Sequence, residues 1–188
     1  MARFTGLLLV LSVSLVPAFA GSETDGLSNF YKVDDHVYRG AQPDDDGFRS
    51  LAKMGVKTIL DLRGPEHSEA DERQLVESLG MRYVADPMKG MHTPTEDQIS
   101  RAIGLMNDSK AWPVFVHCQR GADRTGAVVA CYRIGHDRWE NGKALSEARS
   151  FGMSWYQKAL QHYVMGYEPA ESVAGAPVAA PAAAGVTQ

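Results

Sequence analysis

The sequence predicts an α/β protein with a central, mostly parallel sheet flanked by helices. Short apolar β-type runs alternate along the chain with longer segments of helical periodicity. Strands separated by helices pair in parallel, because each helix returns the chain across the sheet. Gly55 and Gly80 stand where two of the helices should end, and the sequence PTED at 94–97 is typical of a helix start.

The first two strand–helix units occupy the first half of the domain. The run HVYRG at 36–40 predicts a strand, and a helical pattern follows it near 44–54. The run VKTILDL at 56–62 predicts the second strand, and the next helical pattern lies near 66–79.

The second half repeats this order. MRYVA at 81–85 predicts a strand before a helix near 95–108, and PVFVH at 113–117 predicts a strand before a helix that begins at about residue 124. Two further helical segments, KALSEARSF and WYQKALQHYVMGY, complete the domain. In parallel sheets ligands bind beyond the carboxyl ends of the strands. The residues expected at that edge are Asp61 to Arg63, Asp86 and the 117–124 loop.

The first twenty residues predict a cleaved signal peptide. Arg3 precedes an apolar run at 7–16, and AFA at 18–20 has the small-x-small pattern of a cleavage site. The apolar run is well short of the ~20 residues that span a bilayer, which favours cleavage after Ala20 over a retained anchor. We therefore expect an exported protein, periplasmic or secreted, without a stable membrane anchor after cleavage.

The rest of the chain predicts one globular domain with flexible ends. A composition of 44% hydrophobic and 22% charged residues is ordinary for a soluble domain. Residues 21–29 are expected to form a flexible N-terminus, residues 30–167 the folded domain, and residues 168–188 a disordered tail rich in alanine and proline.

Charge and cysteine usage exclude several classes of function. Without residues 1–20 the chain has 18 basic and 23 acidic side chains, a formal charge of −5. A mildly acidic domain is a poor candidate for binding nucleic acid. Cys118 and Cys131 should be separated by about 10 Å of helical rise, too far for a disulfide, so both are expected to be free thiols. No spacing of histidine and cysteine suits a metal, and neither metal nor cofactor is expected.

The stretch HCQRGADRTG at 117–126 has the clearest chemistry in the chain. A loop that leaves a strand and enters a helix presents backbone N–H groups and the positive end of the helix dipole to an anion. Gly121 and Gly126 permit a tight path, and Arg124 adds a planar donor matched to two phosphate oxygens. The expected phosphate-binding residues are Gln119, Arg120, Gly121, Ala122, Asp123 and Arg124.

Cys118 stands at the base of this loop. The positive field should hold its thiol largely as the thiolate at neutral pH, and Thr125 can donate a hydrogen bond to the sulfur. A thiolate below a bound phosphate dianion is a nucleophile directed at phosphorus. Attack would give a phosphocysteine that water then hydrolyses.

The loop resembles the signature of the cysteine-based protein tyrosine phosphatases: His-Cys, five residues, Arg, then Ser or Thr, here His117, Cys118, Arg124 and Thr125. The segments VYRGAQPDDDGFRSLAKMGVKTILDLR and ALSEARSFG also resemble the small atypical dual-specificity phosphatases of bacteria, plants and fungi. The resemblance covers roughly residues 36–165. It implies a phosphatase-like fold in which Cys118 is the nucleophile and His117 braces the loop.

The resemblance also implies a general acid that protonates the leaving oxygen, usually an aspartate about thirty residues before the cysteine. Asp86 lies 32 positions before Cys118, after a predicted strand, and is the first choice. In family loops similar to DPMKGMHTPTEDQI the acid follows the proline, where this chain has Gly90, Met91 and His92. His92 and Asp97 therefore remain alternatives.

Several other residues receive structural interpretations. Asp61 and Arg63 are expected to pair at the surface or at the end of their strand, and Arg39 is expected to hold a turn. Three aromatic residues near the end of the domain are expected to pack the last helices onto the sheet: Phe151, Trp155 and Tyr156.

The sequence thus predicts a cysteine-dependent phosphatase of phosphotyrosine, phosphoserine, phosphothreonine or a small soluble phosphate ester. The alternatives are an inositol-phosphate phosphatase with the same mechanism and a phosphate-binding module with little turnover. Relatives that act on phosphoinositides often have lysine where this chain has Ala122, which weakens the case for an inositol lipid. Arsenate reduction would need a second thiol, and Cys131 is too distant. The expected partner is a phosphorylated protein or small ester, and the expected state is a monomer.

Overall fold

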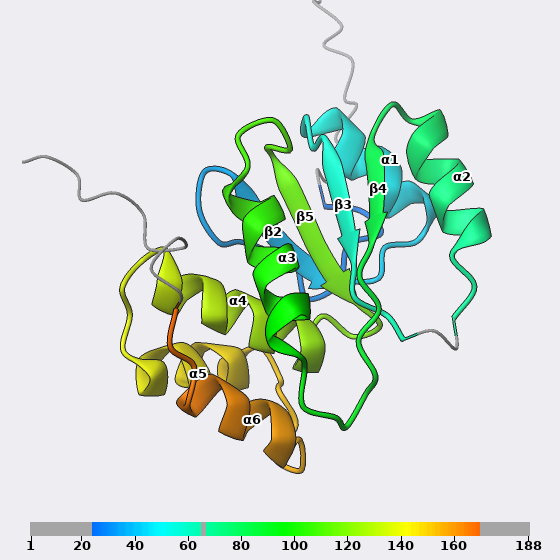
Figure 1. The fold of residues 1–188 in the computed structure, drawn as a ribbon. Helices are drawn as coiled ribbons and strands as arrows, with labels where there is room; N and C mark the ends of the chain where they lie inside the picture. The colour runs from blue at the N-terminus through cyan, green and yellow to red at the C-terminus, as the bar shows by residue number, and fades with distance from the viewer. Residues whose placement is uncertain (1–23, 65–66, 170–188) are drawn as a thin grey trace, which may run out of the picture.

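The computed structural model describes residues 24–64 and 67–169, and its sheet confirms the predicted fold class. The strand order is β1-β2-β5-β3-β4, and every neighbouring pair is parallel except β1 with β2 (Figure 1). The strands are β1 Tyr31–Lys32, β2 Val37–Ala41, β3 Thr58–Asp61, β4 Arg82–Ala85 and β5 Val114–Cys118. The predicted signal peptide and most of the predicted tail lie outside the described residues.

Six helices cover the two faces of this sheet in the described chain. They are α1 Asp45–Lys53, α2 Ala70–Ser78, α3 Glu96–Asn107, α4 Asp123–Gly135, α5 Asn141–Ser150 and α6 Lys158–Met165. Buried residues of α1 and α2 form one apolar cluster with one face of the sheet. Those of α3, α4, α5 and α6 form a larger cluster with the opposite face. Every predicted strand and helix is present, with boundaries shifted by a few residues.

Local sequence explains where the helices begin and end. Asp44 caps α1 by accepting a hydrogen bond from the amide of Gly47 at 2.9 Å. Thr95 and Gln98 form a reciprocal capping box at the start of α3, as the PTED sequence predicts. Gly55 and Gly80 follow the ends of α1 and α2 with φ of +82° and +81°, a conformation that glycine adopts without steric cost.

β5 separates the two apolar clusters at the centre of the sheet. All five of its residues are buried. Val114, Val116 and Cys118 belong to the larger cluster, whereas Phe115 belongs to the smaller one and stacks on His117 with ring centroids 5.8 Å apart. Successive side chains of a strand point to opposite faces, so His117 and Cys118 face different layers of the molecule.

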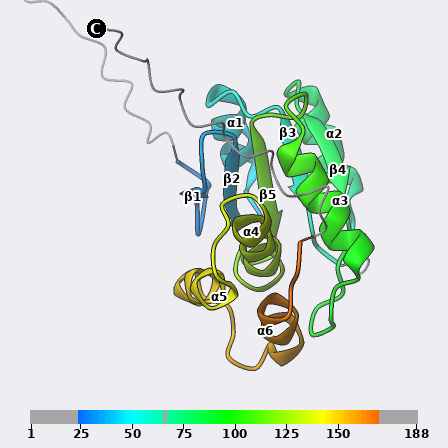
Figure 2. The ribbon, with the colours of Figure 1, turned by 60° about the vertical axis from the view of Figure 1, so that its left-hand side comes forward.

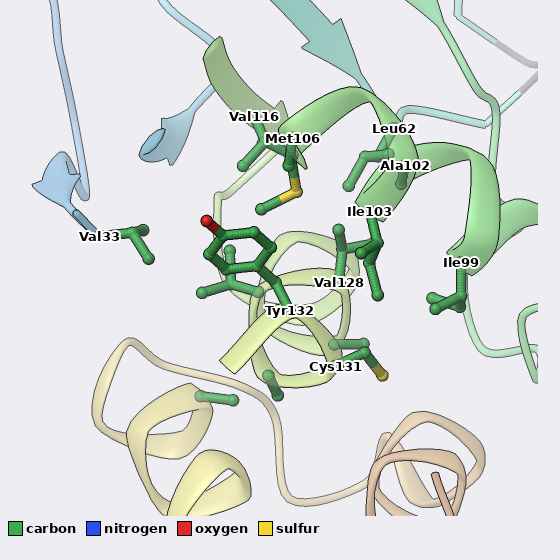
Figure 3. Packing of buried hydrophobic residues seen from close by; sticks show 14 of the residues in the cluster. Val33, Leu62, Ile99, Ala102, Ile103, Met106, Val116, Val128, Cys131 and Tyr132 are labelled. Carbon is green, nitrogen blue, oxygen red and sulfur yellow. The ribbon is translucent and has the colours of Figure 1, made fainter. Parts of the chain in front are cut away.

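α4 lies between the sheet and the outer pair α5 and α6 (Figure 2). Its residues from Thr125 to Gly135 are buried, and Val128, Cys131 and Tyr132 pack among side chains of α3 and the sheet (Figure 3). A helix that is buried all round cannot shift without disrupting the core. The position of its first turn relative to β5 is therefore fixed.

Both cysteines are free, as predicted, and both are buried. Burial raises the pKa of the Cys131 thiol, which keeps this sulfur protonated within the core. No helix in the described part of the chain is long and apolar enough to cross a membrane.

The predicted flexible N-terminus is wrong for residues 24–29. The carbonyl of Ser28 accepts a hydrogen bond from the amide of Ala41 at 2.8 Å, and Leu27 packs against the smaller apolar cluster. The side-chain Nδ2 of Asn29 donates to the carbonyls of Arg120 and Phe151 at 3.2 and 3.1 Å. Polar composition suggested a loose segment, but tertiary hydrogen bonds hold it against β2 and the 119–122 loop.

The prediction that three aromatic residues near the end of the domain pack the last helices onto the sheet is also wrong for two of them. Trp155 and Tyr156 are 77% and 46% exposed and form an edge-to-face pair in the connection between α5 and α6. Phe151 is half-buried, and its ring packs on Tyr31 at 5.0 Å between centroids. Helical periodicity across 155–167 suggested burial, but α6 begins only at Lys158 and the pair lies before it.

Candidate active site

The connection from β5 to α4, residues 119–122, lies directly on β2. β5 pairs Cys118 with Ala41 and His117 with Gly40. Gly121 has φ of +65°, and a Cβ there would lie 2.3 Å from the carbonyl carbon and oxygen of Gly40. Only glycine fits this contact, so the close approach of two backbones determines the path of the loop.

Segments beyond the carboxyl ends of three strands stay side by side at this edge. The Leu62 amide donates to the carbonyl of His117 at 2.9 Å, and the Asp86 amide donates to the carbonyl of Asp61 at 2.9 Å. The Met88 amide donates to the carbonyl of Leu62 at 3.3 Å. The prediction that these segments share one edge of the sheet is therefore confirmed.

The first amides of α4 form the anion-binding part of this edge. Ala122 occupies the N-cap position and provides no side-chain acceptor. Within the described chain, no backbone carbonyl accepts a hydrogen bond from the amides of residues 120–125. Amides without a protein acceptor, at the positive end of a 13-residue helix, are suited to bind phosphate oxygens.

Cys118 and Arg124 occupy the base and the side of this loop. Cys118 is 2% exposed. Arg124 is partly buried, and its Nη1 donates to the carbonyls of Met88 and Leu62 at 3.3 and 3.5 Å. No ion pair among the described residues includes Arg124, so its charge is available to an anionic substrate. Thr125 is fully buried and its Oγ1 has no hydrogen-bond partner in the described structure. The expected hydrogen bond to the sulfur is therefore not formed here.

The outer side chains of the loop bind protein rather than an open site. Arg120 Nη2 pairs with Asp123 Oδ2 at 2.5 Å and donates to Ser154 Oγ at 2.8 Å. Asp123 Oδ1 accepts a hydrogen bond from the Ser154 amide at 2.7 Å, and the exposed Gln119 accepts one through its carbonyl from the amide of Gln42. The contacts of Arg120 and Asp123 tie the loop to the connection between α5 and α6, and the contact of Gln119 ties it to the residue that follows β2. Arg120 and Asp123 can contact phosphate through their amides.

His117 belongs to a buried charged network on the opposite side of β5. Its Nε2 lies 3.0 Å from Glu72 Oε1 and 3.9 Å from Asp61 Oδ1. Arg63 pairs with Asp61 at 2.6 Å and with Glu72 at 2.8 Å, and the Tyr83 hydroxyl donates to Asp61 at 2.6 Å. The predicted pair of Asp61 and Arg63 is thus present at its strand end, buried and part of a larger network.

The network distributes charge so that each carboxylate has a cationic partner. Burial opposes ionisation of Asp61, but hydrogen bonds from Arg63 and Tyr83 and the charge of His117 hold the pKa of Asp61 below its ordinary value. Burial and the hydrogen bond to Asp61 raise the pKa of the Tyr83 hydroxyl.

Asp61, Glu72 and His117 are also close enough together to suggest a metal site. The Arg63 guanidinium bonds to both carboxylates and takes the place that a cation would fill. This set of side chains is better suited to hold His117 in place by hydrogen bonds than to bind a metal ion.

Sequence reasoning missed Glu72 and Tyr83. Glu72 lies four positions before Val76, and both residues are on the buried face of α2. An acidic residue on the apolar face of a predicted helix was the available signal, because buried carboxylates require partners. Which partner it meets depends on how α2 packs against β3 and β5, and no sequence pattern specifies that.

Asp86 is buried at the end of β4 and pairs with Arg101 of α3. Its Oδ1 accepts a hydrogen bond from Arg101 Nη2 at 2.7 Å. Its Oδ2 is buried and has no hydrogen-bond partner in the described structure. One oxygen of Asp86 is thus held in place by an arginine, and the other has no hydrogen-bond partner among the described residues.

The alternative acids lie on the loop that follows. His92 is exposed, and its Nδ1 lies 2.7 Å from the carbonyl of Gly90. This loop and α3 line a cavity of about 480 Å³ that includes Lys89, His92 and Arg101. Asp97 is exposed in the first turn of α3 and does not line that cavity.

Comparison with known proteins identifies a family. The family model described as "DSP-PTPase phosphatase fused to NAD+ Kinase" matches residues 14–162. A putative tyrosine-protein phosphatase, OCA1, from Mycosarcoma maydis is 32% identical over 130 residues, which cover 65% of this chain and 79% of the relative. The inositol diphosphatase DSP3 from Arabidopsis thaliana is 28% identical over 138 residues, 71% of this chain and 67% of the relative.

A solved structure has a similar arrangement. The core catalytic domain of the PP-IP phosphatase SIW14 from S. cerevisiae, in complex with citrate, superimposes with a TM-score of 0.68. It is 25% identical, and the match covers 75% of this chain and 86% of that one.

The close contact of Gly121 with β2 can be tested by adding a side chain at this position. Gly121→Ala should displace the loop, because the new Cβ would overlap the Gly40 carbonyl at 2.3 Å. We expect kcat/KM for an aryl phosphate to fall by about 10²-fold, the usual effect of misplacing a reacting group by about 1 Å. The matched control is Gly104→Ala, where a Cβ meets no atom within 4 Å. Equal activity of the two variants would show that the loop does not depend on this contact.

Proposed function

Because the chain belongs to the cysteine-based protein tyrosine phosphatase superfamily, as a member of its atypical dual-specificity type, we propose that it hydrolyses phosphomonoesters through a phosphocysteine formed on Cys118. The observation that supports this role most directly is the position of one buried thiol. Cys118 ends a central strand and is followed by amides that have no acceptor, and by an arginine that has no carboxylate partner, among the residues that the structure describes.

The first chemical step transfers the phosphoryl group to sulfur. The amides of 119–124 and the Arg124 guanidinium hold the three terminal phosphate oxygens and stabilise the charge that they share in the transition state. The Cys118 thiolate attacks phosphorus, a sulfur–phosphorus bond forms, and the phosphorus–oxygen ester bond breaks. Asp86, protonated through Oδ2, gives its proton to the departing oxygen.

The second step restores the enzyme. A water molecule attacks the phosphorus of the phosphocysteine, and the Asp86 carboxylate accepts the proton that this water loses. The sulfur–phosphorus bond breaks, the thiolate is regenerated and inorganic phosphate leaves. Arg101 holds Oδ1 of Asp86 in place during both steps, so that only Oδ2 exchanges a proton.

We propose a phosphotyrosine, phosphoserine or phosphothreonine residue, or a small soluble phosphate ester, as substrate. OCA1 is named a putative tyrosine-protein phosphatase, and this is one support for a phosphoprotein. Inositol phosphates are the second candidate, because DSP3 is named an inositol diphosphatase and the cavity lined by Lys89, His92 and Arg101 also includes Met88, whose carbonyl accepts a hydrogen bond from Arg124. Ala122, where phosphoinositide-specific relatives often have lysine, counts against an inositol lipid within this second class.

Substitution of the nucleophile tests the mechanism. Cys118→Ser should reduce turnover of an aryl phosphate by at least about a thousandfold, because an un-ionised hydroxyl replaces the thiolate. The variant should still bind phosphate, which is measured by the rise in melting temperature on adding inorganic phosphate. Cys131→Ser, at the other free cysteine, is the control and should retain turnover. Equal rates for wild type and Cys118→Ser would exclude the mechanism. Stabilisation by phosphate with no turnover in the wild type would support the binding module instead.

The identity of the acid is tested by leaving-group dependence. Asp86→Asn should slow an alkyl phosphate by ~10²- to 10⁴-fold and slow a nitrophenyl phosphate far less, because a good leaving group needs little protonation. His92→Gln is measured in parallel and should affect both substrates alike. A selective loss on alkyl phosphate in the His92 variant, and none in the Asp86 variant, would transfer the role to His92.

We also propose that the protein is exported, from the sequence of residues 1–20. The full chain, expressed in a bacterial host with an export pathway, should appear outside the cytoplasm with Gly21 as its first residue. Leu9→Arg, which interrupts the apolar run, should block export and leave the longer precursor in the cytoplasm. A wild-type chain that remains cytoplasmic with residues 1–20 attached would contradict the proposal.

A further inference from the structure

Arg39 is a buried cation directly beneath the phosphate-binding loop. It is 1% exposed and ranks among the largest fully buried side chains of the described residues. It lies on β2 opposite Val116, two residues before Ala41, which pairs with Cys118. Side chains two residues apart on a strand share a face. Arg39 is therefore on the α4 side of the sheet, the side of the Cys118 sulfur, and it does not hold a turn as the sequence suggested.

The hydrogen bonds of Arg39 are incomplete. Nη2 donates to the carbonyl of Gly121 at 2.5 Å, and the guanidinium carbon lies 4.2 Å from the centroid of the Phe151 ring. Nε and Nη1 are buried and have no partner in the described structure. Among the described residues, Arg39 forms no ion pair with a carboxylate, whereas the nearby Arg133 pairs with both Asp137 and Glu147.

A buried charge without a counter-ion raises the free energy of the folded state, so a nearby anion is expected to balance Arg39. The charged groups that act on it are Glu147 of α5, Arg133 of α4 and Cys118 of β5. Glu147 already pairs with Arg133, with bonds of 3.1 and 3.3 Å. Arg133 itself repels Arg39. Glu147 is therefore already balanced by Arg133, which leaves the Cys118 sulfur, on the same face of the sheet as Arg39, as the group whose negative charge Arg39 can balance.

The protonation state of Arg39 agrees with this role. Burial lowers the pKa of Arg39 to about 10, while the charges of Glu147 and Cys118 oppose that effect. The guanidinium therefore remains positive at neutral pH. A fixed positive charge on the same side of the sheet as a thiol favours the thiolate over the thiol.

We propose that Arg39 is a positioning residue that stabilises the Cys118 thiolate from below the loop, while its bond to Gly121 turns that carbonyl away from the bound phosphate. Arg124 and the amides of α4 act on the substrate from above, and Arg120 adds a weaker charge that Asp123 largely neutralises. His117 and its carboxylate partners lie on the other face of β5. The proposal presumes that Cys118 is the nucleophile, as inferred above.

Two substitutions separate the charge of Arg39 from its hydrogen bond. Arg39→Gln retains a donor for the Gly121 carbonyl and removes the charge, whereas Arg39→Lys retains the charge and loses the planar donor group. The exposed Arg49, which pairs with Asp46 on α1, provides the control Arg49→Gln. Folding of each variant is checked first by its melting curve.

The readout is the pH dependence of Cys118 alkylation by iodoacetamide, with the labelled residue identified by mass spectrometry. The Gln variant should shift the midpoint of alkylation upward by about one pH unit or more. The Lys variant and the Arg49 control should stay close to wild type. We expect kcat/KM for an aryl phosphate at pH 6 to fall by at least about tenfold in the Gln variant and to recover in part as the pH rises.

A folded Gln variant with the wild-type midpoint would overturn the proposal. If the Gln variant does not fold, the Lys variant provides the test. An upward shift of a full pH unit in its alkylation midpoint, although the positive charge is retained, would contradict the proposal that the charge of Arg39 stabilises the thiolate. Alkylation needs no turnover, so this result is independent of the Cys118→Ser test. A protein without phosphatase activity would refute the proposed function even if Arg39 controls the thiol.

Discussion

The close approach of the β5–α4 loop to β2 is the constraint on which the site depends. At Gly121 the loop backbone rests on the Gly40 carbonyl with no room for a Cβ, and Arg39 bonds to the Gly121 carbonyl from beneath. β5 supplies the thiol where this contact begins, and the buried helix α4 supplies the amides where it ends. Because the sheet and α4 are both immobile parts of the core, the thiol and the amides have one relative position.

This arrangement places adjacent residues of one strand in two different electrostatic environments. His117 faces a network of Asp61, Glu72, Arg63 and Tyr83 in which every charge has a partner. Cys118 faces the α4 side, where neither Arg39 nor Arg124 has a carboxylate partner within residues 24–64 and 67–169. A balanced network stabilises the strand end without adding to the field at the sulfur. An unbalanced one leaves net positive charge at the place where a thiolate and a phosphate dianion must be accommodated.

The sequence predicted the parts of the fold and site that local rules determine. Alternating strand and helix patterns gave the parallel sheet, helix caps such as Thr95 were visible in the chain, and the spacing of Cys118 and Arg124 indicated an anion-binding loop. The predictions that are wrong concern residues whose position depends on contacts between segments distant in sequence. Polar residues 24–29 are held by bonds to β2 and the loop, and Trp155 is exposed despite helical periodicity around it. The partners of Arg39 and Glu72 come from segments distant in sequence, and no pattern around either residue identifies them.

Unsatisfied polar atoms are concentrated around this one edge of the sheet. In the described chain they include Nε and Nη1 of Arg39, Oδ2 of Asp86 and Oγ1 of Thr125 on or near the α4 side, and both ring nitrogens of His117 and Oε1 of Glu72 on the other. Buried polar groups without partners destabilise a fold, and most proteins have few of them. The proposed partner of Arg39 is the Cys118 thiolate, and that of Asp86 Oδ2 is the leaving oxygen of the substrate. The fold thus accepts a local loss of stability at the site, and the extensive apolar packing of α4 against the sheet and the outer helices offsets it. Binding of a phosphate ester would supply the missing partner of Asp86 Oδ2, so a group that weakens the free protein would favour the complex.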